Sequence, residues 1–146
     1  MSGGGGGIPA RSSAGAFGGH MWSRRWAADI ESGVYPRGGL VVVVENLTEL
    51  TGTSAEAPVD KLVQAVTRGD QLVVGESETS TWSQAWTLAK PFKAGRSGLL
   101  LTPGDSDGDL LLGTSFGRLR RADFPVGRGF LVVSGRARKM QVALPE

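Results

Sequence analysis

Cysteine is absent from this sequence, and His20 is the only histidine among its 146 residues. Without cysteine the chain has no disulfide and no thiolate ligand for a metal ion. A single histidine argues against a histidine-based metal centre or a catalytic triad. Long hydrophobic runs are also missing, because no apolar stretch approaches the roughly 20 residues of a membrane-spanning helix. We therefore expect a chain that does not insert into a membrane.

The charge that is present is unevenly distributed. The formal net charge is only +2, but the segment from Lys90 to Lys139 contains ten Lys or Arg residues against four Asp residues. The basic residues that cluster toward its end are Arg118, Arg120, Arg121, Arg128, Arg136, Arg138 and Lys139. Such a cluster can contact the phosphate groups of nucleic acid or nucleotide, or it can form the solvated face of exposed hairpins.

The first twenty residues, MSGGGGGIPARSSAGAFGGH, contain eight glycines and no hydrophobic period. Such a stretch buries too little surface to offset its ordering entropy, so we expect residues 1–20 to be disordered and one folded domain to cover 21–146. The glycines suggest a phosphate-binding loop, but no Gly-Lys-Ser/Thr follows them and no strand precedes them. An intact ATPase with its phosphate loop in this leader is therefore the least favoured interpretation.

The hydrophobic pattern after residue 20 alternates between helices and strands. Trp22, Trp26 and Ile30 share one face of a predicted helix, which Gly33 and Pro36 end. The apolar run at 40–44 is typical of a strand buried on both faces of a parallel sheet. The next expected elements are a helix at 59–66, a strand at 71–75, a helix from Thr79 or Ser80 to Pro91 that carries Trp82 and Trp86, and a strand at 98–102. This order predicts a parallel α/β sheet with right-handed crossovers.

The pattern changes after residue 105, where turn-rich stretches separate short apolar runs. We predict that this segment forms short strands and hairpins that close the domain. The expected strands are 110–112, 130–133 and 140–144. The fold class expected for the chain is therefore α/β, with a parallel sheet followed by C-terminal β-hairpins.

The turn DSDGD, with Asp105, Asp107 and Asp109, has the spacing that begins a calcium-binding loop. In such a loop the sixth residue is Gly and the twelfth is Glu, whereas this chain has Leu110 and Phe116 at those positions. A tight hairpin turn explains the three aspartates better.

Glu45 and Asn46 follow the apolar run LVVVV, where a Walker B motif places its acidic residues. The first carboxylate of that motif orients Mg²⁺, and the second polarises the attacking water. Glu45 can serve a metal ion, but Asn46 cannot act as a base because an amide does not accept a proton near neutral pH.

The order of segments from Val41 to Leu144 resembles the C-terminal two-thirds of a P-loop ATPase domain of the FtsK/SpoIIIE family. The likeness is strongest to the actinobacterial branch that includes the ATPases of type VII secretion. The segments that carry it are VVVVEN, LVVGESET, RSGLLLTPGDSDGDLLLG and FPVGRGFLVVSGRARKMQVALPE, of which the last is the most specific.

The resemblance implies roles for particular residues. Glu45 and Asn46 would occupy the Walker B pair, with Glu45 as the candidate Mg²⁺ ligand. Glu76 and Ser77 would occupy the sensor-like position, and Gly127-Arg128-Gly129 would lie near the nucleotide. ATP and Mg²⁺ would be the cofactors, and the location would be cytoplasmic, at the inner face of the membrane within a larger complex.

Two departures from the family change the expected activity. The Walker A strand, loop and helix are missing, and the acidic pair is Glu-Asn. Our first hypothesis is therefore a partial RecA-like module that does not hydrolyse ATP by itself. Its partners would be the rest of the ATPase or neighbouring modules, with secreted polypeptide or DNA as cargo, and its exposed sheet edge would promote association. The alternative is a stand-alone α/β module that recognises an acidic peptide or nucleic acid through Arg118, Arg120 and Arg121.

Overall fold

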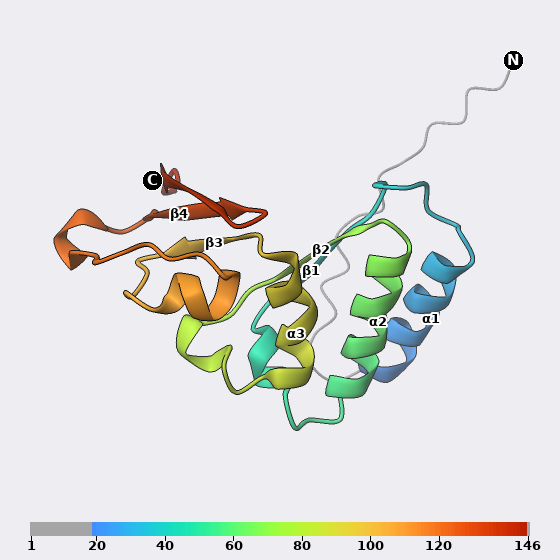
Figure 1. Cartoon of the computed structure of the whole chain (residues 1–146). Coiled ribbons are helices and arrows are strands. Elements are labelled where there is room, and N and C mark those ends of the chain that lie inside the picture. Colours follow the sequence, from blue (N-terminus) through green and yellow to red (C-terminus); the bar gives the residue numbers. More distant parts are fainter. Residues whose placement is uncertain (1–18, 146) are drawn as a thin grey trace, which may run out of the picture.

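A computed structural model describes residues 19–145 of the chain, with the side chains of residues 25–145 (Figure 1). The N-terminal part contains helix α1 (Gly19–Glu31), strand β1 (Val41–Val44), helix α2 (Glu56–Arg68) and strand β2 (Leu72–Gly75). The two strands pair in parallel, from Val41 opposite Leu72 to Val44 opposite Gly75. This arrangement confirms a parallel β–α–β unit, and the chain as a whole is mixed α/β.

Helix α2 connects the two parallel strands and covers one face of them. Its buried residues are Val59, Leu62, Val63, Ala65 and Val66. Ile30 of α1 joins Leu62 and Val66 in a cluster with Val42 of β1, and α1 and α2 lie side by side (Figure 1). The predicted helix at 22–30 is thus confirmed, with Ile30 buried and Trp26 half-buried. The side chain of Trp22 lies outside the described ones.

The expectation that the strand at 40–44 is buried on both faces is wrong. Val42 is 8% exposed, whereas Val41 and Val43 are 55% and 59% exposed. The physical reason is that α1 and α2 form a layer on one side of the β1–β2 pair only. Continuous valine runs therefore indicated a strand but did not indicate how many of its faces are covered.

Helix α3 spans Trp86–Gly95 and does not end at Pro91, so the predicted helix at 79–91 is wrong at both ends. Residues Thr79–Thr81 form a short 3₁₀ turn, and Trp82 precedes α3. Pro91 lies in the second turn, where its missing N–H removes a single ladder bond to Thr87. Leu88 and Ala89 are the buried residues of this helix, which ends where Arg96 adopts a left-handed conformation.

The C-terminal part forms a second sheet from β3 (Gly98–Leu101), β4 (Arg128–Val133) and β5 (Arg136–Gln141). Both pairings are antiparallel, in the order β3-β4-β5. The prediction that the strand at 98–102 belongs to the parallel sheet is therefore wrong, because Leu100 pairs with Phe130 and packs in their common core. A hairpin forms as predicted, but its second strand is Arg136–Gln141 and the expected strand at 140–144 is wrong in its bounds. The hairpin turns through Ser134 and Gly135, whose φ angles of 49° and 77° suit a two-residue turn.

The predicted strand at 110–112 is a π-helical turn, η3 (Gly108–Leu112). Leu111 and Leu112 are buried in the C-terminal core, whereas Leu110 is exposed. Successive side chains of a strand point to opposite faces, so a strand could not direct both Leu111 and Leu112 into the same core. In the preceding turn, Asp107 Oδ2 accepts a bond from the Gly104 N–H at 2.7 Å and Asp105 Oδ1 accepts one from Leu119 at 2.9 Å. Two of these aspartates thus stabilise backbone turns.

None of the helices in the described part of the chain is both long and apolar enough to cross a membrane.

Candidate functional site

The polar residues that follow β1 and β2 lie together. Glu76 N–H donates to Val44 C=O at 2.9 Å, and its carboxylate Oε2 accepts from the Asn46 backbone N–H at 3.2 Å. The Leu47 N–H donates to Glu76 C=O at 2.8 Å. Asn46 itself adopts a left-handed conformation with φ 50°, which ends the strand. The carboxyl ends of the parallel pair therefore bring together Glu45, Asn46, Glu76 and Ser77, the residues that the sequence placed there.

Ser77 belongs to a network of hydroxyl groups that holds the two loops against each other. Its Oγ accepts from the Thr48 N–H at 3.0 Å and lies 2.9 Å from the Thr48 hydroxyl. Thr48 Oγ1 also lies 2.7 Å from Thr81 Oγ1, and Trp82 Nε1–H donates to Ser77 C=O at 3.3 Å. Thr48 is buried. Thr48 and Thr81 could not be recognised from the sequence, because isolated threonines are common in loops.

These strand ends do not fit the phosphates of a nucleotide. The loops 45–55 and 76–85 contain four glutamates and no Lys or Arg, so their charge would repel a triphosphate. The Glu76 carboxylate is already bonded to the Asn46 N–H. Among the described residues, no three His, Cys, Asp or Glu side chains lie close enough to hold a metal ion. The leader glycines lie outside the described residues.

Gly127, Arg128 and Gly129 lie in the other sheet, at the start of β4. The Arg128 N–H closes a turn on Pro125 C=O at 2.9 Å, and Gly127 has φ 80°. A Cβ at Gly129 would collide with the Leu100 carbonyl of β3. In the described part of the chain no hydrogen bond or ion pair joins these three residues to the ends of β1 and β2. Backbone geometry therefore explains why both positions are glycine. Arg128 is exposed.

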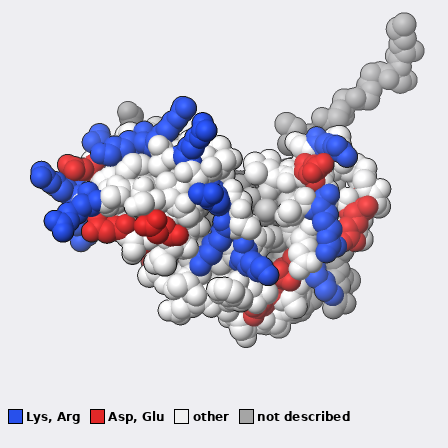
Figure 2. Space-filling view, in the orientation of Figure 1, with Lys and Arg blue, Asp and Glu red and all other residues white. Residues whose placement is uncertain are grey.

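The basic cluster is exposed on the loop before β4 and on both sides of the C-terminal sheet. Side chains alternate along a strand, so Arg136 and Arg138 lie on the face opposite to that of Arg128 and Lys139. Figure 2 shows Lys and Arg side chains at this end of the molecule, with Asp and Glu side chains among them. All seven members, Arg118, Arg120, Arg121, Arg128, Arg136, Arg138 and Lys139, are exposed. Among residues 25–145 the only ion pair is Arg37–Asp70, which lies before β1 and β2 and involves none of these seven residues. We call these seven residues the basic surface; its charges have no acidic partners within the described chain.

An open hollow lies beside the basic surface. Its volume is about 490 Å³, and Arg121, Phe124 and Asp105 contribute to its lining. The ammonium of Lys139 lies 5.4 Å from the centre of the Phe124 ring, a cation–π contact that holds the lysine against the sheet. Basic and apolar groups therefore lie side by side here.

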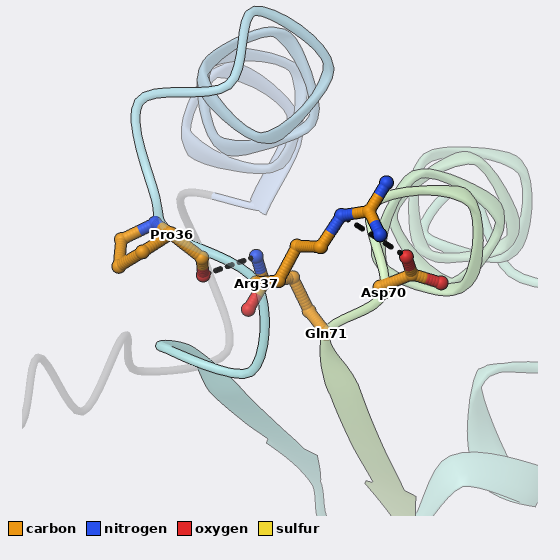
Figure 3. Close-up of polar contacts among 4 residues, drawn as sticks. All are labelled: Pro36, Arg37, Asp70 and Gln71. Atoms are coloured by element: carbon orange, nitrogen blue, oxygen red, sulfur yellow. Dashed lines mark hydrogen bonds and ion pairs between the residues drawn. The ribbon is translucent and has the colours of Figure 1, made fainter.

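A separate polar contact joins the loops before β1 and β2 (Figure 3). The Gln71 amide donates to Pro36 C=O at 2.9 Å and accepts from the Leu40 N–H at 2.9 Å. Arg37 Nε lies 3.5 Å from Asp70 Oδ2 in an exposed ion pair. These contacts fix the amino ends of the strands, and neither was foreseen from the sequence.

No protein-family model, no curated protein and no solved structure matches this chain. Its function has to be inferred from the geometry of its own surfaces.

Proposed function

We propose that this chain is a binding module that holds an acidic peptide or nucleic acid on its basic surface. The observation that carries the proposal is the set of seven exposed cations without an ion pair. Arginines on folded surfaces commonly lie near carboxylates, whereas here Asp105 and Asp107 accept bonds from backbone N–H groups. These cations can therefore attract an anionic partner, because no acidic side chain of the described chain pairs with them.

Arg118, Arg120 and Arg121 are the residues of this surface that are best placed to reach a partner. They lie on the loop around the turn Arg121–Asp123, beside the hollow that Arg121 helps to line. The buried Phe124 anchors this loop. Because the loop backbone is already held in place, it loses little conformational entropy when a partner binds. Guanidinium groups also bind carboxylates and phosphates through two parallel hydrogen bonds.

The test is a fluorescence-anisotropy titration with a labelled polyglutamate peptide and a labelled DNA duplex. The triple variant Arg118→Ala/Arg120→Ala/Arg121→Ala should bind at least about tenfold more weakly, since each lost contact removes roughly half a kcal/mol or more. The control Lys61→Ala/Arg68→Ala changes two cations of α2 and should bind normally. Binding should also weaken as salt rises. Equal affinities of both variants would overturn the proposal.

A second candidate is a non-hydrolytic module of the FtsK/SpoIIIE type with a partial RecA-like sheet. It is supported by the parallel β1–α2–β2 unit, whose carboxyl ends bring Glu45, Asn46 and Glu76 together as the resemblance implies. Its role would be to dock within a larger cytoplasmic motor that moves polypeptide or DNA. The repulsive charge at these strand ends favours a docking role over a hydrolytic one. Turnover above background in an ATPase assay with saturating Mg-ATP would contradict this candidate.

A further inference from the structure

Each of the two sheets has one face that no helix of the described residues 19–145 covers. On the β1–β2 pair this face consists of Val41, Val43, Leu72 and Val74, which are 42–59% exposed. On the C-terminal sheet it consists of Leu99, Leu101, Leu131 and Val133, which are 39–56% exposed. We call them the valine face and the leucine face. Exposed aliphatic groups of this extent on a sheet typically mark a contact surface.

The valine face ends in negative charge. Val41 lies opposite Leu72 and Val43 opposite Val74, and side chains alternate between the two faces along a strand. Glu45 and Glu76 follow these two columns in the chain. The bond from Glu76 N–H to Val44 C=O extends the ladder to Glu76, whose carboxylate accepts from the Asn46 N–H, while Glu45 begins the turn after β1. The face therefore presents two aliphatic rows followed by two glutamates, both exposed.

The leucine face is bordered by positive charge. Leu99 lies opposite Leu131, which lies opposite Arg138, so these three residues form one row across the sheet. Val133 lies opposite Arg136 in a neighbouring row. Arg136 and Arg138 thus share the leucine face along its β5 edge, and both are exposed without an ion pair. No aromatic residue lies on this face to stack with a base, which favours a polypeptide partner over nucleic acid.

We propose that a second copy of this chain covers the leucine face with its valine face. Two sheets pack face to face through aliphatic side chains, and this pairing brings Glu45 and Glu76 of one copy toward Arg136 and Arg138 of the other. The inference rests on the proposed function, because these arginines belong to the basic surface; it identifies an acidic partner for them. A single contact of this kind leaves one valine face and one leucine face free, where a further copy can bind.

Contacts between two like faces are electrostatically less favourable than the contact between a valine face and a leucine face. Two leucine faces in contact would enclose four arginines without an acidic partner, and two valine faces would enclose four glutamates. Like charges in an interface disfavour the pairing. Charge therefore selects the unlike pairing, while the aliphatic rows supply its stability.

The test is sedimentation velocity over a range of protein concentrations, with one variant for each face. Leu131→Asp disables the leucine face, and Val43→Asp disables the valine face. The wild-type sedimentation coefficient should rise with concentration, and each variant alone should stay monomeric. Their equimolar mixture should form a one-to-one pair, since Leu131→Asp keeps an intact valine face and Val43→Asp an intact leucine face. Leu110→Asp, at a leucine that is 62% exposed outside both faces, should assemble as the wild type does.

All three positions are exposed, so the far-UV circular dichroism of the variants should match that of the wild type. A second arm tests the charges: Arg136→Ala/Arg138→Ala should weaken self-association at least about tenfold, and Lys61→Ala/Arg68→Ala should not. A monomeric wild type, or a mixture without the one-to-one pair, overturns the inference. If that monomer still binds polyglutamate, only the inference fails; if it binds no polyanion either, the proposed function fails as well.

Discussion

The two sheets of this chain differ in how their strands connect and in the charge that they carry. β1 and β2 are parallel and require α2 as a crossover, whereas β4 and β5 are joined by a two-residue turn. Residues 41–80 contain seven Asp or Glu against two Lys or Arg, and residues 90–139 contain four against ten. In the parallel pair, the acidic residues Glu45 and Glu76 lie together at the carboxyl ends of the strands. In the antiparallel sheet, the basic residues Arg136, Arg138 and Lys139 lie along the edge strand β5.

This contrast separates a stability role from a binding role. The acids at the ends of β1 and β2 lie beside a network of internal hydrogen bonds. The cations of the C-terminal sheet have no such partners among the described residues, apart from the contact of Lys139 with Phe124. The polar residues of the first region therefore hold its own loops, while the cations of the second are free to attract an anionic partner.

The largest effect is expected in the N-terminal core, at Leu62→Ala. Leu62 is 1% exposed and packs in the cluster with Ile30 and Val42. Removing it should lower the free energy of unfolding by about 2–5 kcal/mol, because a cavity is left between α2 and the parallel pair. Chemical denaturation followed by circular dichroism measures this. Leu110→Ala, at an exposed leucine, serves as the control; an equal loss there would contradict the assignment of the core.

In the C-terminal sheet we expect a somewhat smaller loss for Gly129→Ala. The added Cβ would meet the Leu100 carbonyl, so β3 and β4 would have to move apart. The cost should be about 1–3 kcal/mol. Gly95→Ala is the matched control, since nothing lies within 4 Å of a Cβ there. Amide exchange should increase in β3 and β4 and stay unchanged in β1; faster exchange in β1 alone would contradict the separation of the two sheets.

The hydroxyl network is tested by Thr48→Val. This change keeps the shape of a buried side chain but removes its hydrogen bonds to Ser77 and Thr81. We expect a loss of about 1 kcal/mol in the free energy of unfolding, with no effect on polyanion binding. Thr87→Val, at an exposed threonine, is the control. A stability equal to that of the wild type would show that the network contributes nothing to holding the loops.

The smallest effect is expected at Arg37→Ala. Its guanidinium is 88% exposed and its partner Asp70 is 62% exposed. Water screens such a pair, so the free energy of unfolding should change by less than about 0.5 kcal/mol. Gln71→Leu, which loses two hydrogen bonds at the same strand ends, should cost more. The reverse order in thermal denaturation would contradict this prediction.

The sequence predicted those elements whose signals are local. The helices around Ile30 and Leu62 follow from apolar spacing, and short C-terminal strands follow from apolar runs between turn-rich stretches. The placement of Asn46 and Glu76 at the strand ends came from the resemblance, and the structure joins the Asn46 N–H to the Glu76 carboxylate. Elements whose partners lie far along the chain were not predictable in this way.

The wrong predictions share a physical cause, since each depends on tertiary contacts. Leu110–Leu112 is apolar enough for a strand, but the shape of the core under β4 selects a helical turn. Pro91 normally ends a helix, yet packing of Leu88 and Phe92 outweighs the single lost hydrogen bond. Val41 and Val43 are exposed because α1 and α2 pack on the other side of the β1–β2 pair. A run of valines does not show on which side of a strand the helices pack.

The most direct test of the binding role is amide chemical-shift mapping with unlabelled polyglutamate on the full chain carrying Val43→Asp, the change that prevents self-association through the valine face. The proposed function predicts that the shifts change with peptide concentration at residues 118–139, over the basic surface, and that residues 45–48 and 76–81 stay unchanged. Changes confined to the ends of β1 and β2, with none at 118–139, would contradict it.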